Sequence, residues 1–321
     1  MDSTILPWIG LISSLSLLYK LANFAWVYWL KPSQLHRYLH TTNGKPAWAM
    51  VTGASDGIGK QFARELAKDG FNVVIHGRNK TKVARVQEEL SAEFPTRSFR
   101  ALLADCSSIS CQNCRNKLGE NDNVDFDAIV NALSDINLTV LINNAGGVPV
   151  PIYQYLHETA PERLITTTNL NAIFPLLLQS KLLPQLIQNS PSLIMNIGSM
   201  ADMGLPMLTA YAGSKRLLNC TSECISRELR MLGKDVEVLM VRVGEVCGTV
   251  YSQVKPSLFE PDSNTMARAA LDRVGCGMSV VVGYWAHAVH IAALPWLPQF
   301  VVDRSFMDAV GSRTKNQWKK E

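Results

Sequence analysis

The sequence has few charged residues and no block of one sign. Only 18% of its 321 residues are charged, and 31 basic residues stand against 27 acidic ones, which gives a net charge of +4. Proteins that bind nucleic acid by releasing counterions gather basic residues in one run or on one face. The absence of such a run predicts no nucleic-acid partner. A hydrophobic content of 47% indicates instead that part of the surface meets lipid.

The cysteines do not form a disulfide framework. There are seven, an odd number without regular spacing, which favours a reducing compartment over a secreted scaffold. Cys106, Cys111 and Cys114 lie close together in the sequence. No second pair follows at finger-like spacing and no histidine lies among them, so we expect no metal site.

A long apolar run opens the chain, from Ile5 to Leu30, interrupted mainly by Lys20. About 20 such residues cross the hydrocarbon core of a bilayer. No Lys or Arg precedes the run and no clear cleavage site follows it, which favours an anchor over a signal peptide. Basic residues from Lys31 to Lys45 follow the run and predict a cytosolic domain. Because a lysine at mid-bilayer is costly, single-span, monotopic and hairpin insertion all stay open.

A second uncharged stretch, residues 278–302, lies near the other end. Pro295 and Pro298 break it, so it is a poor spanning helix. Residues 279–283 have the pattern of a last buried strand. The remainder, which includes Trp296, either rests on a membrane surface or closes a pocket.

The pattern from residue 48 to 75 is apolar strand, glycine turn, amphipathic helix, apolar strand, the right-handed βαβ unit of a doubly wound sheet. The turn, Thr-Gly-Ala-Ser-Asp-Gly-Ile-Gly, lies between a strand at 47–51 and a helix at 60–69. Glycines there let the backbone approach a pyrophosphate, which the helix N-terminus attracts. The predicted cofactor-binding residues of this turn are Gly53, Ser55, Asp56, Gly57, Ile58 and Gly59.

The end of the second strand, 72–75, lacks an acidic residue that could accept hydrogen bonds from a ribose 2′-hydroxyl. Arg78 offers a planar fork to a 2′-phosphate instead, so the pattern favours NADP(H) unless Arg78 is only a solvated loop charge. Asp105 follows the strand at 101–104 and is placed either to touch the adenine or to begin a turn.

Polar residues also end two later strands. The strand at 139–142 runs into Asn143-Asn144-Ala145-Gly146, and the strand at 193–197 runs into Gly198-Ser199. Tyr211 and Lys215 follow at a spacing that puts both on one helix face. A nearby ammonium lowers the pKa of a phenol from about 10, which makes it a usable general acid or base. Tyr-x-x-x-Lys alone is common on surfaces; its occurrence after the other motifs predicts an active site.

In this order the motifs resemble the short-chain dehydrogenase/reductase family, over residues 44–285. The resemblance implies an α/β fold, a Rossmann-type doubly wound parallel sheet in a single domain. It implies a catalytic tetrad of Asn169, Ser199, Tyr211 and Lys215, with Asn171 as the alternative for the first. Ser199 would polarise the substrate oxygen, Tyr211 would donate its proton, Lys215 would hold the nicotinamide ribose, and Asn169 would seat a water. Further implied contacts to the cofactor come from Asn144, Tyr211, Lys215 and Val246.

Softer motifs resemble one branch of that family. The apolar N-terminus, the Gly-Lys-Pro-Ala-Trp-Ala segment at 44–49 and the Gly-Tyr-Trp-Ala-His segment at 283–287 look like the very-long-chain 3-oxoacyl-CoA reductase and 17β-hydroxysteroid dehydrogenase group of the endoplasmic reticulum. This implies NADPH-driven reduction of a 3-oxoacyl-CoA in fatty-acid elongation. The alternatives are a steroid or polyketide-type ketoreductase, and an inactive binding or scaffold protein of the same fold. Relatives commonly pair near the tetrad, so a homodimer is one option.

Three departures from the family pattern concern the pocket. The gap between Ser199 and Tyr211 is one residue shorter than usual, Val243-Gly244 replaces a Pro-Gly turn, and Thr249 comes one place late. We therefore expect an altered loop at 200–208 and an altered lid at 251–266. The expected division is an anchor and linker at 1–40, an NADP-binding domain at 41–285, and an apolar segment with a basic tail at 286–321.

Overall fold

The structure is a computed structural model that describes residues 5–109, 124–249 and 255–318. The strands of this part of the chain form one seven-stranded parallel sheet in the order β3-β2-β1-β4-β5-β6-β7. The order reverses between β1 and β4, the place where such sheets bind ligands. The strands are β1 (Ala47–Val51), β2 (Asn72–Gly77), β3 (Phe99–Leu103), β4 (Asn137–Asn143), β5 (Ser192–Ser199), β6 (Val236–Val243) and β7 (Val280–Val282).

Helices cover both faces of the sheet, so the central strands are buried on both sides and read as continuous apolar runs. In β1, Ala49 and Val51 pack into one core while Trp48 and Met50 pack into the other. The first face is covered by α2 (Gly57–Lys68), α3 (Lys80–Glu93) and α8 (Ser263–Leu271). The second is covered by α4 (Phe126–Leu133), α6 (Phe174–Gln188) and α7 (Thr209–Met231). The predicted Rossmann-type sheet is confirmed.

The predicted strands and the first βαβ unit are present, with several boundaries shifted by one to three residues. Helix α2 begins at Gly57 and not at Lys60, because the carboxylate of Asp56 accepts a hydrogen bond from the Gly57 N–H at 2.8 Å and caps the helix. The second glycine therefore belongs to the first helical turn. This places backbone N–H groups of α2 directly at the end of β1.

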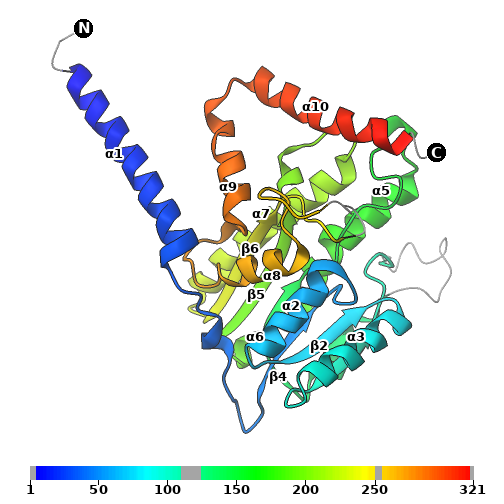
Figure 1. Cartoon of the computed structure of the whole chain (residues 1–321). Helices are drawn as coiled ribbons and strands as arrows, with labels where there is room; N and C mark the ends of the chain where they lie inside the picture. Colours follow the sequence, from blue (N-terminus) through cyan, green and yellow to red (C-terminus); the bar gives the residue numbers. More distant parts are fainter. Residues whose placement is uncertain (1–4, 110–123, 250–254, 319–321) are drawn as a thin grey trace.

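The apolar N-terminus forms α1 (Ile5–Ala25), followed by a π-helical turn at Trp26–Leu30, and it stands away from the domain (Figure 1). Two helical stretches of the described chain are long and apolar enough to cross a membrane, Trp8–Leu30 and Pro161–Gln188. The second is 44% buried and includes α6 of the core, whereas the first is 0% buried. Of the two, α1 is therefore the one available to lipid.

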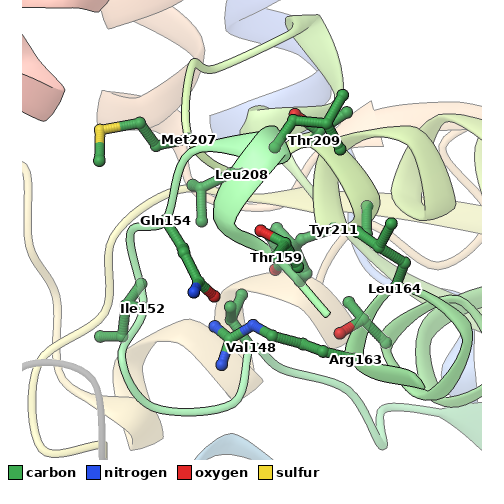
Figure 2. Close-up of a pocket in the computed structure, with 13 residues that line it drawn as sticks. Val148, Ile152, Gln154, Thr159, Arg163, Leu164, Met207, Leu208, Thr209 and Tyr211 are labelled. Atoms are coloured by element: carbon green, nitrogen blue, oxygen red, sulfur yellow. The ribbon is translucent and has the colours of Figure 1, made fainter. Parts of the chain in front are cut away.

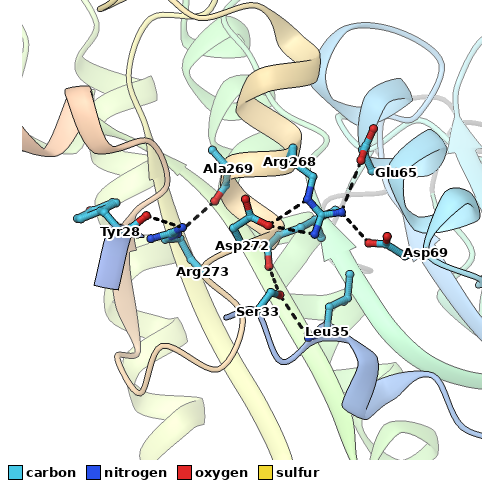
Figure 3. Close-up of polar contacts among 10 residues, drawn as sticks. Tyr28, Ser33, Leu35, Glu65, Asp69, Arg268, Ala269, Asp272 and Arg273 are labelled. Carbon is cyan, nitrogen blue, oxygen red and sulfur yellow. Dashed lines mark hydrogen bonds and ion pairs between the residues drawn. The ribbon is translucent and has the colours of Figure 1, made fainter. Parts of the chain in front are cut away.

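Polar contacts fix the stem of α1 to the edge of the domain (Figure 3). The Tyr28 hydroxyl donates to the Val282 carbonyl at 2.7 Å, and the Arg273 guanidinium donates to the Val27 carbonyl. Ser33 donates to the Leu271 carbonyl at 2.7 Å. The direction in which α1 leaves the domain is thus set by α8 and β7.

The last part of the chain rises beside α1 and then crosses the domain (Figure 1). It consists of α9 (Trp285–Ala292), a 3₁₀ turn at Leu294–Trp296 and α10 (Gln299–Trp318). Helix α10 runs toward α5 (Pro161–Thr168), and Val310 and Thr314 on it are buried. Of these elements, α5 contributes lining residues to the candidate site.

Candidate active site

Hydrogen bonds connect the glycine turn after β1 to the end of β4. The Thr52 hydroxyl oxygen accepts from the N–H groups of Asn144 and Ala145, both at 2.9 Å. The Asn144 side chain donates to the Thr52 carbonyl at 3.0 Å. Gly53 has a φ of +65°, and a Cβ there would lie 2.9 Å from the Ala145 Cα. Only glycine fits at residue 53, because the two turns meet at the switch point.

Two of the other predicted residues of the turn shape its outer side. Asp56 caps α2 and pairs with Lys82 at 3.2 Å. Partial burial acts to raise the pKa of Asp56, but the Gly57 N–H and Lys82 hold it below its usual value. Ser55 lies against the end of β2, with its hydroxyl 3.2 Å from the point where a Cβ of Gly77 would stand. These groups border the N-terminus of α2, where a phosphate would bind.

The buried side chain of His76 contacts the glycine turn. No sequence motif predicts a role for this histidine. The Gly53 N–H points to Nδ1 of His76 at 3.4 Å, and the ring stacks on Phe174. Burial lowers the pKa of His76 to about 4, so the ring is neutral at pH 7 and can accept this bond.

Arg78 and Asp105 lie next to each other beyond β2 and β3. Arg78 Nη1 is 3.5 Å from Asp105 Oδ2, and the arginine side chain is 73% exposed. The Ser107 backbone N–H and hydroxyl both donate to Asp105. Partial burial acts to raise the pKa of Asp105, but these bonds and Arg78 hold it low. Asp105 is thus held in a turn by Ser107, and the Arg78 guanidinium that pairs with it is exposed to solvent.

Lys215 and Tyr211 lie together on the first turns of α7, at the end of β5. The Lys215 side chain is buried, its Nζ donates to the Ile197 carbonyl at 2.8 Å, and it lies 5.9 Å from the centre of the Tyr211 ring. Burial lowers the pKa of Lys215 to about 8. The ammonium is therefore still the main form at pH 7, and it lies close to the Tyr211 phenol.

The structure does not bring Asn169 to this pair, which corrects the first choice for the tetrad. The Asn169 side chain instead donates to the Ile109 carbonyl at 3.0 Å. Asn171 is fully buried instead, and donates to the Gly147 and Thr167 carbonyls at 2.8 Å. The chain forms a π-helical turn at Asn169–Ile173, and this turn changes which side chains face the site.

The side chains of Asn171 and Lys215 both lie close to Gly146. A Cβ built on Gly146 would lie 2.8 Å from the Asn171 Oδ1 and 3.0 Å from the Lys215 Nζ. Both polar groups thus face the same small space, and a side chain at residue 146 would fill it. The glycine of the Asn-Asn-Ala-Gly motif is required here by proximity, since its φ is not in the left-handed region.

Ser199 ends β5 and caps the turn that follows it. Its hydroxyl oxygen accepts from the Ala201 N–H at 3.1 Å, at the start of a 3₁₀ turn formed by Met200–Met203. The shortened loop closes with Met207 at a φ of +60°, a left-handed conformation that costs a non-glycine residue about 1–2 kcal/mol. The short gap to Tyr211 is therefore accommodated by a strained residue beside the pocket.

A buried ion pair anchors the same turn to the sheet. The Asp202 side chain is fully buried, pairs with Arg242 on β6, and accepts from the Asn219 amide at 3.1 Å. This network ties the residues after Ser199 to both β6 and α7. No sequence spacing predicts this network, because its residues lie far apart along the chain.

A pocket opens beside Tyr211 (Figure 2). Its lining is mixed: seven of the thirteen lining residues are apolar, and Gln154, Arg163, Tyr211 and three threonines supply the polar groups. Gln154 donates to the Glu158 carbonyl at 2.9 Å, and Arg163 holds the Pro149 carbonyl at 2.8 Å. The other lining residues are Val148, Ile152, Leu156, Thr159, Leu164, Thr167, Met207, Leu208, Thr209 and Ala210.

The lid loop after β6 is held by His287, the histidine of the 283–287 motif. Its Nδ1 lies 3.2 Å from the Gly244 N–H, and its Nε2 lies 3.0 Å from the Phe259 carbonyl. A Cβ at Gly244 would lie 2.9 Å from this ring. Burial lowers the pKa of His287, so its neutral ring connects Gly244, directly after β6, with Phe259 in the expected lid segment.

The remaining predicted cofactor-binding residues are Val246, in the loop after β6, and Ile58, in the glycine turn. Val246 and Ile58 pack against the same core, and the Val246 carbonyl accepts from the Thr249 hydroxyl at 3.2 Å. The Thr249 methyl lies 3.8 Å from the point where a Cβ of Gly57 would stand. Thr249 thus faces the glycine turn despite its late position.

The described residues contain no group of three His, Cys, Asp or Glu side chains that could hold a metal. Cys106 is buried, which raises the pKa of its thiol. Cys111 and Cys114 lie outside the described residues, as does part of the expected lid segment, 251–254.

Comparisons with known proteins agree with this geometry. Residues 47–257 match the short chain dehydrogenase family. A very-long-chain 3-oxoacyl-CoA reductase of Pyricularia oryzae is 31% identical over 253 residues, which cover 76% of this chain and 71% of that protein. "Putative steroid dehydrogenase 1" of Caenorhabditis elegans is 29% identical over 262 residues, with coverage of 81% and 78%. A metagenomic short-chain oxidoreductase solved in complex with NADP has a TM-score of 0.54 at 25% identity, covering 74% of this chain and 96% of that one.

Proposed function

The chain belongs to the short-chain dehydrogenase/reductase family, and we propose that it uses NADPH to reduce the 3-oxo group of a long-chain acyl-CoA to a hydroxyl. It is an NADP(H)-dependent oxidoreductase of the branch that holds the 3-oxoacyl-CoA reductases and steroid dehydrogenases. The interpretation as an inactive scaffold of the same fold is disfavoured by the presence of Tyr211 and Lys215 side by side. The substrate is the part that needs an experiment.

The observation that carries the proposal is the position of Tyr211. The phenol borders a pocket of mixed apolar and polar lining, and the buried Lys215 ammonium lies 5.9 Å from its ring centre. A carbonyl in the pocket would therefore meet a proton donor whose conjugate base is stabilised by a desolvated cation. The seven apolar side chains of the lining would contact the lipophilic part of the substrate.

The residues at the sheet's switch point fit a dinucleotide. Gly53, Gly57 and Gly59 keep backbone close to the pyrophosphate, the N-terminus of α2 faces it, and Arg78 would pair with the 2′-phosphate. When bound, NADPH supplies a hydride to the carbonyl carbon. Lys215 would hold the nicotinamide ribose.

The protein's own part in the reaction is to supply and replace one proton. As the carbonyl becomes a hydroxyl, its oxygen takes the proton of the Tyr211 phenol, and Ser199 polarises that oxygen. The phenolate is stabilised by Lys215 and regains its proton from solvent through a water that we assign to Asn171 in place of Asn169. The sum is one hydride and one proton added across the C=O bond.

The proposed membrane role is supported by α1, which is apolar, exposed from Trp8 to Asn23 and fixed in direction by its stem. We propose that it anchors the protein in the endoplasmic-reticulum membrane with the catalytic domain in the cytosol, as the basic residues after it suggest. A substrate dissolved in the same membrane would then have a short path to the pocket.

A steroid ketone is the second candidate, supported by a relative with that name. It differs from an acyl-CoA in having no flexible chain and no phosphates. The mixed lining beside Tyr211 favours neither substrate over the other, so turnover has to decide between them.

The test is NADPH oxidation by the detergent-solubilised full chain with a long-chain 3-oxoacyl-CoA, a ketosteroid, or NADH in place of NADPH. We expect turnover of the acyl-CoA with NADPH and its loss in Tyr211→Phe, which removes the proton donor and keeps the ring. Turnover of the ketosteroid alone would establish the second candidate. Reduction of neither substrate by a protein that still binds NADPH would refute both.

A further inference from the structure

The C-terminal end of the molecule carries an exposed apolar surface that the catalytic site does not use. We call residues 289–300 the C-terminal turn; it comprises the end of α9, the 3₁₀ turn at Leu294–Trp296 and the start of α10. Trp296 is 74% exposed and Phe300 is 73% exposed. No Asp, Glu, Lys or Arg occurs from residue 274 to residue 302. A patch of this kind usually marks a surface that meets another apolar phase.

The C-terminal turn lies beside α1, the proposed anchor (Figure 1). Near the domain, the rings of Trp29 and Trp285 lie 6.1 Å apart. Farther along α1, the Lys20 ammonium lies 4.6 Å from the centre of the Trp296 ring. Helix α9 therefore runs antiparallel to α1. At 1.5 Å per residue, the turn accompanies α1 for roughly 13 Å from the domain.

This arrangement is fixed by the contacts that hold both segments to the domain. Tyr28 binds the Val282 carbonyl and Arg273 binds the Val27 carbonyl, just before α9 begins. At its other end, α10 is held by an ion pair between Arg313 and Glu245 on the lid loop. A bilayer that takes up α1 thus meets the C-terminal turn as well.

We propose that the C-terminal turn inserts into the same bilayer leaflet as α1, so that two elements hold the protein to the membrane. The inference rests on the proposed anchoring by α1. A reach of roughly 13 Å is less than half of the roughly 30 Å hydrocarbon core, so the turn enters one leaflet and does not cross. Helix α10 carries exposed charges at Asp303, Arg304 and Asp308, which keep the rest of it at the membrane surface.

The proposal also accounts for Lys20, the charge that interrupts the apolar run. In the bilayer its ammonium would face the Trp296 ring, and a cation–π contact is stronger when it is removed from water. Lys20 is therefore matched by a residue 276 positions away in the sequence.

The experiment uses the full chain in phosphatidylcholine vesicles, with the photoreactive residue p-benzoylphenylalanine placed at one position at a time. The positions are Leu297 in the C-terminal turn, Leu17 on α1 and Met231 at the end of α7, which are all exposed apolar residues. After irradiation, mass spectrometry identifies what each position has captured. Retained NADPH binding shows that each variant is folded.

We expect lipid adducts at Leu297 and Leu17 and none at Met231. Lipid at Leu17 without lipid at Leu297 would overturn the inference and leave the α1 anchor in place. A second copy of the chain captured at Leu297 would overturn it in favour of a dimer surface. Equal lipid labelling at Met231 would overturn it by showing unspecific contact. Lipid at neither Leu17 nor Leu297 would refute both the inference and the anchor, while the reductase assay stands apart.

Discussion

Adding one methyl group at Gly146 tests the arrangement of Asn171 and Lys215 directly. A Cβ there would lie 2.8 Å from the Asn171 Oδ1 and 3.0 Å from the Lys215 Nζ, where ordinary contact begins at 3.4 Å. The two polar groups must therefore retreat by about half an ångström. Misplacing a catalytic group by 1 Å costs about 10²-fold in rate, so we expect Gly146→Ala to lower kcat by about 10-fold.

Gly213→Ala is the matched control, because Gly213 lies on α7 two residues before Lys215 and nothing stands within 4 Å of its Cβ position. We expect it to leave kcat unchanged and to stabilise the helix by about 0.5–1 kcal/mol. Steady-state NADPH oxidation and thermal unfolding of both variants measure this. A Gly146→Ala enzyme with full kcat would refute the view that the amide and the ammonium share the space beside residue 146.

Three further predictions concern the cofactor, pH and stability. Arg78→Glu should raise KM for NADPH by about 10- to 100-fold and leave KM for NADH nearly unchanged, since only a 2′-phosphate loses a charge-assisted bond; equal effects on both cofactors would contradict this. Because burial lowers the pKa of Lys215 to about 8, its ammonium is present below that pH and lost above it, so a kcat–pH profile should fall above about pH 8; a flat profile to pH 10 would contradict it. Asp202→Ala should lower the free energy of unfolding by about 3–5 kcal/mol in denaturant titrations, because it leaves Arg242 as an unpaired and largely buried charge. Adding Arg242→Leu should recover most of the loss. A loss below about 1 kcal/mol in the single variant would contradict the prediction.

The sequence predicted those features that depend on local pattern. The glycine turn, the strands around it and the pairing of Tyr211 with Lys215 each follow from short spacings, and the structure has all of them. The resemblance could not decide between Asn169 and Asn171, and the structure turns the Asn169 amide toward the Ile109 carbonyl and places the Asn171 amide beside Gly146. A regular helical period does not predict the π-helical turn at Asn169–Ile173, and two asparagines two residues apart face different sides of a helix.

Long-range contacts were the other features that the sequence could not predict. His287 bridges Gly244 and Phe259, and Lys20 meets Trp296, so the purpose of each residue depends on a partner far along the chain. No spacing rule connects such pairs, because they exist only once the sheet has assembled. The catalytic roles of Ser199 and Asn171 and the boundaries of the anchor stay predictions.

The central claim is that this enzyme delivers a hydride to the 3-oxo carbon of a long-chain acyl-CoA. The most direct measurement supplies NADPH deuterated at the transferred position to the full chain with a long-chain 3-oxoacyl-CoA, and analyses the product by mass spectrometry. We predict a 3-hydroxyacyl-CoA with a single deuterium at carbon 3, formed by the native enzyme and absent with Tyr211→Phe. Recovery of unreduced substrate, from a preparation that still binds NADPH, would contradict the account.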